Sequence, residues 1–364
     1  MIYLDNAATT ACLPEVWQAM QRAYASYGSV HRSQHPYSEA TTYSYENARV
    51  QVADFIGAQK EEIIFTSGTT DSINRIARGW GDKHVGPEDE VVITAFDHNS
   101  NYLPWKALCE RTGAKLRILS HEECFGEITL GERTKIVAFP LVCNVDGTQM
   151  PITNLAQAAR KVGAVTVLDA AQGLLYWQDI VTIFHESIDF VAFSGHKLHG
   201  PTGIGVLFAK HEMTPVSFGA GPLKMEVGTP PVIQAIGLGA ACQFWQRFGT
   251  SRIQERLIEL EKTVTRNLRA MPGVEVVKQS SCFPPGIVAF TMDGFHPHDI
   301  ATELGNRGIC IRGGRHCNDL YHDAAGISAT CRISFSVFNT LKEIDVFIDA
   351  LKDLQRRGLF HANL

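Results

Sequence analysis

The stretch Asp189–Gly205, DFVAFSGHKLHGPTGIG, begins as an apolar run and ends in polar and glycine-rich sequence. Its start, DFVAF, predicts a strand that is buried on both faces, as in a parallel sheet. In sheets of that kind, ligands bind beyond the carboxyl ends of the strands. Lys197 follows the strand end closely, and a lysine there can form an imine once its surroundings lower its pKa. The alternative is that Lys197 is a solvated surface charge, as most lysines are. A tight turn alone would explain the glycines, without a functional role.

Six other short runs resemble DFVAF and alternate with segments of helical period. In chain order, the full set reads EIIFT, DEVVITA, AKLRILS, KIVAFPLV, AVTVLDAA, DFVAFSGH and IGVLFA. This alternation predicts a mostly parallel sheet with crossover helices on both faces. The segments 101–113 and 151–163 are amphipathic, and the second opens with Pro and closes with Gly, as helices prefer. The predicted fold class is therefore α/β.

The chain is long enough for two domains. Single cores stop growing at roughly 250 to 300 residues, and this sequence has 364. A long helical stretch with a Gly-Thr break leads into VEVVKQ, GIVAFTMD, ICIRGG, TCRISFS and a final helix, which together predict a small α+β lobe. We place a large domain at 1–245, whose N-terminal arm (1–15) could pack with the small domain, and the small domain at 246–364.

Composition excludes several classes of protein. Hydrophobic residues make up 45% and charged residues 20%, which are ordinary globular values. A net charge of -5 argues against nucleic-acid binding, which needs clustered basic residues. Nine cysteines without a CxxC pair fit neither a disulfide scaffold nor a zinc site. With no apolar leader and no membrane-length apolar run, we expect a cytoplasmic protein with a small-molecule partner and no membrane.

Three more strand ends carry candidate functional residues. Ser67–Asp71 opens a helix and offers N–H groups and hydroxyls to an anion, although a plain helix cap would use the same residues. His98 could stack on an aromatic cofactor or move protons, or it could simply be a core or capping histidine. Asp169 ends a fully apolar strand and needs a positive partner, such as a protonated pyridine nitrogen, unless it caps a helix.

A further candidate cluster lies in the predicted small lobe. Cys317 follows Arg312, Arg315 and His316, and Arg332 lies in TCRISFS. Basic neighbours would lower the pKa of a thiol and make it a good nucleophile. With nine cysteines in the chain, inert packing is the alternative explanation.

The order of these residues along the chain favours one cofactor. An anion-binding helix start, a histidine, a strand-end aspartate and a strand-end lysine follow one another. Pyridoxal phosphate (PLP) needs its phosphate anchored, its ring stacked, its ring nitrogen kept protonated and its aldehyde held by a lysine. Each requirement has a residue.

Over nearly its whole length the chain resembles the class V aminotransferases, and within them the cysteine desulfurases and selenocysteine lyases. The resemblance is carried by YLDNAATT, HRSQHPYS, FTSGTTDSIN, DHNSN, CNVDGT, LDAAQG, FSGHKLHGPTGIG, GTPPV, RGGRHC and CRISFSVFNT. It implies the PLP-dependent aminotransferase fold (type I), a homodimer, and a cysteine desulfurase that converts L-cysteine to L-alanine. Its sulfur would pass as a persulfide on Cys317 to a separate acceptor protein, for Fe-S cluster or other sulfur biosynthesis.

The resemblance also implies individual roles. Lys197 would be the Schiff-base lysine, His98 would stack and handle protons, Asp169 would hold the pyridine nitrogen, and Gln172 would lie near the ring oxygen. The remaining assignments are Thr69, Thr70, Ser194 and His196 for the phosphate, Thr229 for a phosphate across the dimer interface, and Asn144 and Arg332 for the substrate. Arg332 would pair with its α-carboxylate.

Three features depart from the pattern of the resemblance. The segment Lys210–Gly228 is shorter than in the branch whose cysteine loop reads RxGxHC, whereas GTPPV resembles the other branch. Cys143 stands where a serine is expected, which we interpret as a packing variant. The subfamily and the sulfur acceptor therefore stay open.

Other functions fit the same motifs. A selenocysteine lyase would bind the alanyl moiety that selenocysteine shares with cysteine, through the same residues. In a PLP aminotransferase or another PLP lyase, Cys317 would be incidental, because the fold and cofactor do not determine the reaction. A non-catalytic binding module is a more distant alternative, against which the presence of both Lys197 and Asp169 argues.

Overall fold

A computed structural model describes residues 1–184, 187–210, 226, 228–277 and 286–357. The chain divides into two compact units. The large unit comprises residues 10–141 and 150–250, and the small unit comprises residues 1–9, 142–149 and 251–364. The domain boundary placed between residues 245 and 246 remains a prediction.

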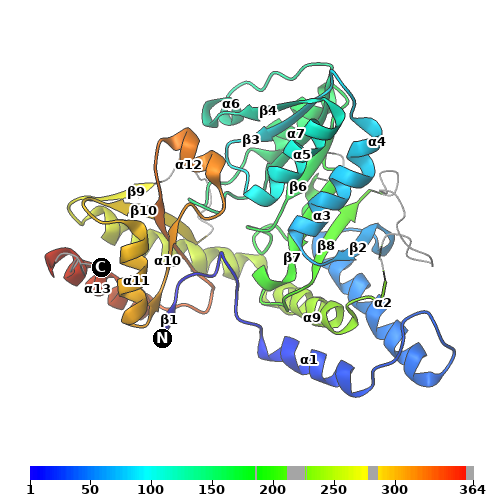
Figure 1. The fold of residues 1–364 in the computed structure, drawn as a ribbon. Coiled ribbons are helices and arrows are strands. Elements are labelled where there is room, and N and C mark those ends of the chain that lie inside the picture. The colour runs from blue at the N-terminus through cyan, green and yellow to red at the C-terminus, as the bar shows by residue number, and fades with distance from the viewer. Residues whose placement is uncertain (185–186, 211–225, 227, 278–285, 358–364) are drawn as a thin grey trace. The chain divides into compact units, whose positions relative to one another are not determined.

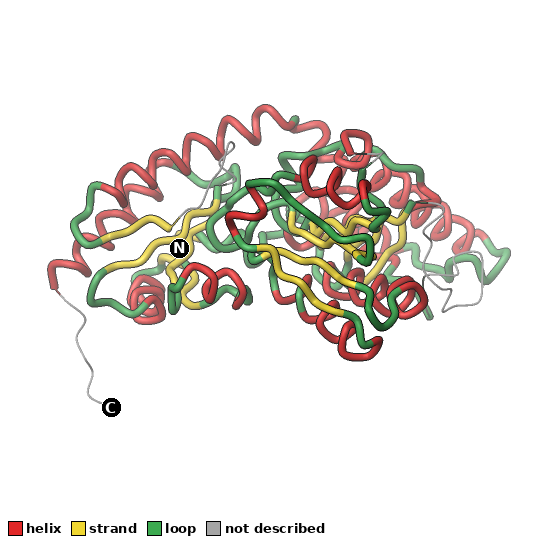
Figure 2. The backbone as a smooth tube through the Cα atoms, turned by 90° about the horizontal axis from the view of Figure 1, so that it is seen from above, coloured by secondary structure: helices red, strands yellow, loops and turns green. Residues whose placement is uncertain are grey.

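A seven-stranded sheet forms the centre of the large unit, and Figure 2 shows its strands lying together among helices. The spatial order is β2-β8-β7-β6-β5-β3-β4, and β8 is antiparallel to both of its neighbours, whereas the other pairs are parallel. The strands are β2 (Ile63–Thr66), β3 (Glu90–Thr94), β4 (Lys115–Leu119), β5 (Thr134–Pro140), β6 (Val165–Asp169), β7 (Phe190–Ser194) and β8 (Gly205–Ala209). They coincide with the seven predicted runs, which confirms the α/β prediction.

The burial of these strands explains their sequences. Every residue of β2, β6, β7 and β8 is buried, so both faces of the sheet are covered there, and continuous apolar runs result. The edge strand β4 has exposed residues and a more polar sequence. Helix α3 packs on β7 and β8, α5 on β4, and α7 on β5 and β6 (Figure 1).

Glycines in the left-handed region end three helices of the large unit. Gly57 (φ 75°) ends α2, Gly113 (φ 78°) ends α5 and Gly249 (φ 91°) ends α9, the last at the predicted Gly-Thr break. Within the described ranges, no helix is both long and apolar enough to cross a membrane. The helices of this unit are α1 (Pro14–Ala25), α2 (Pro36–Ile56), α3 (Thr69–Ile76), α4 (Asp82–His84), α5 (Leu103–Thr112), α6 (His121–Phe125), α7 (Ile152–Lys161), α8 (Ile180–Phe184) and α9 (Val232–Phe248).

The small unit contains a four-stranded antiparallel sheet in the order β12-β13-β10-β9, and a separate parallel pair of β1 with β11. The run ICIRGG forms two short strands in different sheets, because β11 pairs with the N-terminal arm and β12 pairs with β13. The strands are β1 (Ile2–Tyr3), β9 (Val274–Val277), β10 (Ile287–Met292), β11 (Ile309–Cys310), β12 (Arg312–Gly314) and β13 (Thr330–Ser334). The helices that follow α9 are α10 (Thr250–Arg269), α11 (Pro297–Asn306), α12 (Asp319–Ala325) and α13 (Leu341–Arg357).

Two backbones approach closely where β8 begins. A Cβ atom at Gly205 would lie 2.4 Å from Gly68 Cα and 2.6 Å from the Phe193 carbonyl oxygen. Gly68 directly precedes α3, so this approach places the helix start against the end of β7 and the start of β8. Only glycine fits here without moving one of the backbones.

Gly205→Ala is expected to lower the free energy of unfolding by about 1–3 kcal/mol, the usual cost of overpacking. Urea unfolding followed by circular dichroism measures the change. Gly131→Ala is the control, because nothing lies within 4 Å of its added Cβ atom. Equal midpoints for the two variants would contradict the close approach at Gly205.

Candidate active site

Polar residues from four strands of the large unit gather at one edge of the sheet. Because β2, β3, β6 and β7 run in the same direction, their carboxyl ends meet there. The segments that follow these ends are 67–71, 97–101, 169–172 and 194–197. Except for Thr229, every residue that the sequence suggested for the cofactor belongs to one of these segments.

The start of α3 is joined directly to the end of β7. Thr69 donates its backbone N–H to Ser194 Oγ (2.9 Å), and the two hydroxyl oxygens lie 2.7 Å apart. Thr70 Oγ1 lies 2.7 Å from Ser100 Oγ, which adds the loop after β3. Hydroxyls and the N-terminal N–H groups of a helix are the donors that an anion requires. This cluster therefore suits a phosphate.

His98 lies on a loop that a buried carboxylate holds. Its Nδ1 accepts from the Ser100 N–H (3.0 Å), so the proton of a neutral ring is on Nε2, and His98 does act as a cap. Asp97, which is fully buried, accepts from the Thr94 N–H (2.7 Å) and from its hydroxyl (2.8 Å). Burial raises the pKa of Asp97 well above its ordinary value. Hydrogen bonds to Asp97 therefore hold the loop in place. Asp97 is part of the motif DHNSN, but the sequence predicted no role for it.

Asp169 and Lys197 influence each other electrostatically. Asp169 ends β6, is 4% exposed, and accepts from the Ala171 N–H (2.9 Å). Burial raises its pKa, and the Lys197 cation opposes that shift. The residues that follow Asp169 form turns, so the alternative of a helix cap is not realised. Gln172 is half-buried in this turn.

His196 is tied to the segment before α1. Its carbonyl oxygen accepts from the Thr10 N–H (2.9 Å) and from the Thr10 hydroxyl (2.8 Å). Burial lowers the pKa of His196, and the Lys197 cation lowers it further. The two contacts from Thr10 therefore help to hold the segment 194–197, which begins at the end of β7, in place.

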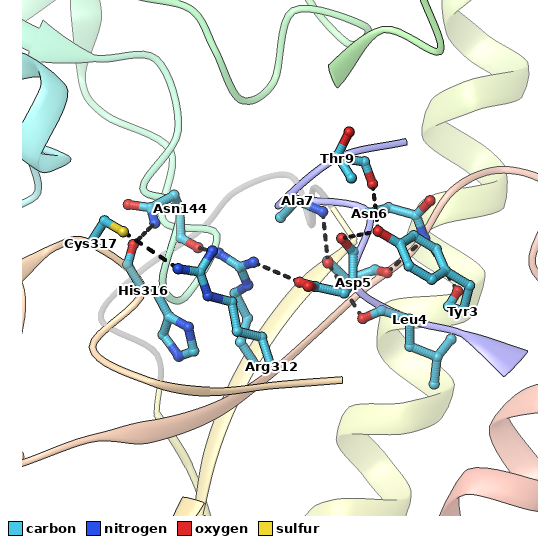
Figure 3. Close-up of polar contacts among 12 residues, drawn as sticks. Tyr3, Leu4, Asp5, Asn6, Ala7, Thr9, Asn144, Arg312, His316 and Cys317 are labelled. Atoms are coloured by element: carbon cyan, nitrogen blue, oxygen red, sulfur yellow. Dashed lines mark hydrogen bonds and ion pairs between the residues drawn. The ribbon is translucent and has the colours of Figure 1, made fainter. Parts of the chain in front are cut away.

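Asn144, Arg332 and Cys317 all lie in the small unit, and Figure 3 labels Asn144 and Cys317. Asn144 donates from Nδ2 to the His316 carbonyl oxygen (2.8 Å), and its backbone carbonyl accepts from Arg332 Nη1 (2.9 Å). Asn318, which the sequence reasoning missed, donates to Asn144 Oδ1 (3.1 Å) and caps α12 by accepting from the Tyr321 N–H. The residues on either side of Cys317 are thereby fastened to Asn144.

Cys317 is exposed at the tip of an unusual turn. His316 and Cys317 both have φ 55°, a conformation that non-glycine residues rarely adopt and that tends to occur at functional sites. Arg312 Nη2 donates to the Cys317 sulfur at 3.4 Å. Figure 3 draws this contact.

The other basic residues near Cys317 are engaged differently from what the sequence suggested. Arg315 pairs with Asp319 (2.7 Å) and Asp323 (2.5 Å). His316 is 2% exposed, and burial holds its pKa well below the ordinary value, so its ring is neutral near pH 7. Positive charge near the thiol comes from Arg312, while the Arg332 guanidinium also interacts electrostatically with it.

Two further residues noted in the sequence are Thr229, which follows the segment 210–228, and Cys143, which directly precedes Asn144. Thr229 is exposed in a bend after Gly228, whose carbonyl oxygen accepts from Arg32 (3.0 Å). Most of the segment 210–228, predicted to be short, lies outside the described residues. Cys143 is fully buried, as a packing variant would be.

Comparison with known proteins identifies the family. The family model "Aminotransferase class-V" matches residues 2–347. A probable cysteine desulfurase of Streptomyces coelicolor is 37% identical, with 98% of this chain and 92% of the relative covered. A cysteine desulfurase of Haloferax volcanii is 34% identical, with 96% and 88% covered.

Solved structures agree with the sequence relatives. The apo structure of a cysteine desulfurase from Thermococcus onnurineus NA1 has a TM-score of 0.90 at 34% identity, with 98% of this chain and 95% of that chain covered. The cysteine desulfurase CsdA from Escherichia coli has a TM-score of 0.89 at 31% identity, with the same coverage. These matches, together with the polar residues that gather at one edge of the large-unit sheet (segments 67–71, 97–101, 169–172 and 194–197; hereafter the large-unit cluster), show that the chain belongs to the class-V aminotransferase family.

Proposed function

We propose that this chain is a PLP-dependent cysteine desulfurase that converts L-cysteine to L-alanine and receives the sulfur on Cys317. The observation that carries the proposal is the exposed Cys317 thiol, held at 3.4 Å from Arg312 in the same unit as Asn144 and Arg332. A transaminase has no need of such a thiol. The relatives and solved neighbours, which are named cysteine desulfurases, support the same reaction.

Enzymes of this family use PLP, and the large unit has residues that fit it. When bound, PLP supplies an electron sink that stabilises negative charge on the substrate. Asp169 is a buried carboxylate of the kind that needs a positive partner, which a protonated ring nitrogen would provide. Its proposed companions are Lys197 for the aldehyde carbon, His98 for stacking and proton transfer, Gln172 for the ring oxygen, and Thr69, Thr70, Ser194 and His196 for the phosphate.

The substrate would be held by the small unit. Arg332 is proposed to pair with the α-carboxylate, because a planar guanidinium offers two parallel N–H donors. Asn144 Nδ2 uses one of its hydrogens on the His316 carbonyl and has a second for the substrate. The same contact joins the orientation of Asn144 to that of the residue preceding Cys317.

Cys317 is proposed to act as the sulfur acceptor. Its thiolate attacks the substrate sulfur, so an S–S bond forms as the substrate Cβ–S bond breaks. The electron pair of the broken bond stays with the carbon skeleton, which takes up a proton and leaves as alanine. Arg312 donates to the Cys317 sulfur and so positions it before the attack. A separate acceptor protein would then remove the persulfide sulfur.

Incubating the purified holoenzyme with L-cysteine tests the proposed function. We expect alanine and, with a thiol reductant, sulfide in equal amounts. Formation of a keto acid in place of alanine would instead identify an aminotransferase. A parallel assay with L-selenocysteine measures the preference between sulfur and selenium. The cytoplasmic location and the existence of a separate acceptor protein remain predictions.

We further propose a homodimer in which Thr229 reaches the phosphate bound by the partner subunit. Thr229 is exposed, and so are several aromatic side chains of α1 and α2, which would give a second copy apolar surface to cover. Those aromatic residues are Trp17, Tyr24, Tyr37 and Tyr43.

Light scattering is expected to give twice the mass of the chain. Thr229→Ala should weaken PLP binding about five- to tenfold, since a hydrogen bond to a charged group contributes about 1.5 kcal/mol or somewhat less when exposed. Equilibrium dialysis of the cofactor measures this change, and Thr250→Ala, at the start of α10, is the control. A fully active monomer would remove Thr229 from the site.

A further inference from the structure

We propose that Asp5, on the N-terminal arm, is a positioning residue that orients the Arg332 guanidinium for the carboxylate of the substrate. This inference rests on the proposed function insofar as Arg332 binds an α-carboxylate. Neither the motif YLDNAATT nor the resemblance had suggested a role for Asp5. Both residues belong to the small unit.

Two contacts on different nitrogens hold the Arg332 guanidinium, and Figure 3 labels the two residues that accept them, Asp5 and Asn144. Arg332 Nη2 donates to Asp5 Oδ1 at 2.8 Å, and Nη1 donates to the Asn144 carbonyl oxygen at 2.9 Å. Nε is buried and has no hydrogen-bond partner among the described residues, so it does not contribute to the orientation. Each terminal nitrogen retains a second N–H. The rotation of the guanidinium is thus set before a substrate arrives, with two donors remaining.

The burial of Arg332 makes a counter-ion necessary. Its side chain is 1% exposed, and that of Asp5 is 20% exposed. Burial lowers the pKa of Arg332, and the Asp5 carboxylate opposes this shift. Arg312 and Arg332 both carry positive charge near Cys317, so Asp5 also offsets their mutual repulsion. A buried ion that loses its partner is strongly destabilised and tends to reorient toward another acceptor or water.

The arm is fastened to the same strand that carries Arg332. Asp5 forms a parallel bridge with Ser334, two residues beyond Arg332 on β13. The Asn6 side chain donates to the Ser334 carbonyl oxygen (3.0 Å), and the Ala7 N–H donates to Ser334 Oγ (2.8 Å). At the start of the arm, β1 pairs with β11. These anchors fix the Asp5 carboxylate relative to Arg332, which is what a positioning residue requires.

L-Alanine and ethylamine provide a matched pair of ligands, because they differ only by the α-carboxylate. Titrating the holoenzyme with each, followed by the change in cofactor absorbance, gives two dissociation constants. Asp5→Asn should lower the preference for alanine over ethylamine at least tenfold and leave the ethylamine constant within twofold. Asp5→Ala should lower it further, because it also removes the hydrogen-bond acceptor. Asp323→Asn is the control, since it removes a carboxylate from another arginine pair, that of Arg315, in the same unit.

Two results would overturn the proposal. An unchanged preference in Asp5→Asn would mean that Asp5 stabilises the fold only, whereas a larger preference would mean that Asp5 competes with the substrate. If neither variant folds, Asp5→Glu keeps the charge but displaces it by one methylene, and it should lower the preference as well. These binding constants do not depend on desulfuration. A wild-type protein that makes no alanine from cysteine, together with a lowered preference in Asp5→Asn, would reject the proposed function and leave the role of Asp5 standing.

Discussion

Lys197→Ala is expected to lose the visible absorbance of the holoenzyme and at least about a thousandfold of its activity, a loss on the scale seen when a covalent catalytic group is removed. Lys197 lies just beyond β7 in η4 (Gly195–Lys197). This is the sheet edge that also carries Asp169 and the hydroxyls of Thr69 and Ser194. A lysine in this place is proposed to hold the cofactor covalently. Without its amine, PLP is held by non-covalent contacts only and exchanges on dialysis.

Borohydride reduction followed by peptide mass spectrometry measures the covalent link directly. In the wild-type protein, the reduced cofactor should be found on the peptide that contains Lys197. Lys210→Ala is the matched control, because Lys210 directly follows the neighbouring strand β8 and pairs with Asp189. It should retain both absorbance and activity. A reducible cofactor that persists in Lys197→Ala would assign the link to a different lysine.

The parts of the fold that the sequence predicted correctly depend on local patterns. The buried strands read as continuous apolar runs, and two helix ends coincide with Gly113 and with Gly249 of the Gly-Thr break, where φ is positive. The large-unit cluster was predictable for a related reason. In a parallel sheet, residues that directly follow the strands meet at one edge whatever their spacing in the chain.

The parts that could not be predicted depend on contacts between distant segments. Asp5 and Arg332 are 327 positions apart, and nothing local to either residue indicates their pairing. In the sequence, Asn318 looks like an ordinary helix cap. Its hydrogen bond to Asn144 joins residues that are 174 positions apart. The basic residues near Cys317 could be counted in the sequence. Only the structure shows that Arg315 is engaged by Asp319 and Asp323.

Cys317→Ala is expected to separate binding from chemistry. The variant should retain PLP and still change its absorbance when cysteine binds, because Asn144, Arg332 and the large-unit cluster are untouched. Alanine formation from cysteine should fall at least about a hundredfold, since removing the attacking group leaves positioning and electrostatics only. Persulfide on the protein should disappear altogether. Mass spectrometry of the intact protein and an alanine assay measure the two effects.

Backbone strain at Cys317 is the same in the wild type and in Cys317→Ala, so it does not affect their comparison. Cys317 has φ 55°, and alanine has the same Cβ atom as cysteine, so both residues meet the same steric cost in the left-handed region. The thermal midpoint of Cys317→Ala should therefore match the wild type within about 1 °C or 2 °C, given that surface substitutions change stability by about 0.5 kcal/mol or less. Cys12→Ala is the chemical control, because Cys12 is also an exposed thiol and lies in the large unit.

The outcome with selenocysteine refines the assignment. The carbon–selenium bond is weaker than the carbon–sulfur bond, so Cys317→Ala can retain activity on selenocysteine while losing it on cysteine. Near-wild-type alanine formation from cysteine by this variant would contradict the role of Cys317 and favour an aminotransferase or another lyase. That result would leave the proposal for Lys197 intact, because the two residues belong to different units and act on different atoms. The contact between Arg312 and the sulfur would then be a packing interaction rather than a means of positioning a nucleophile.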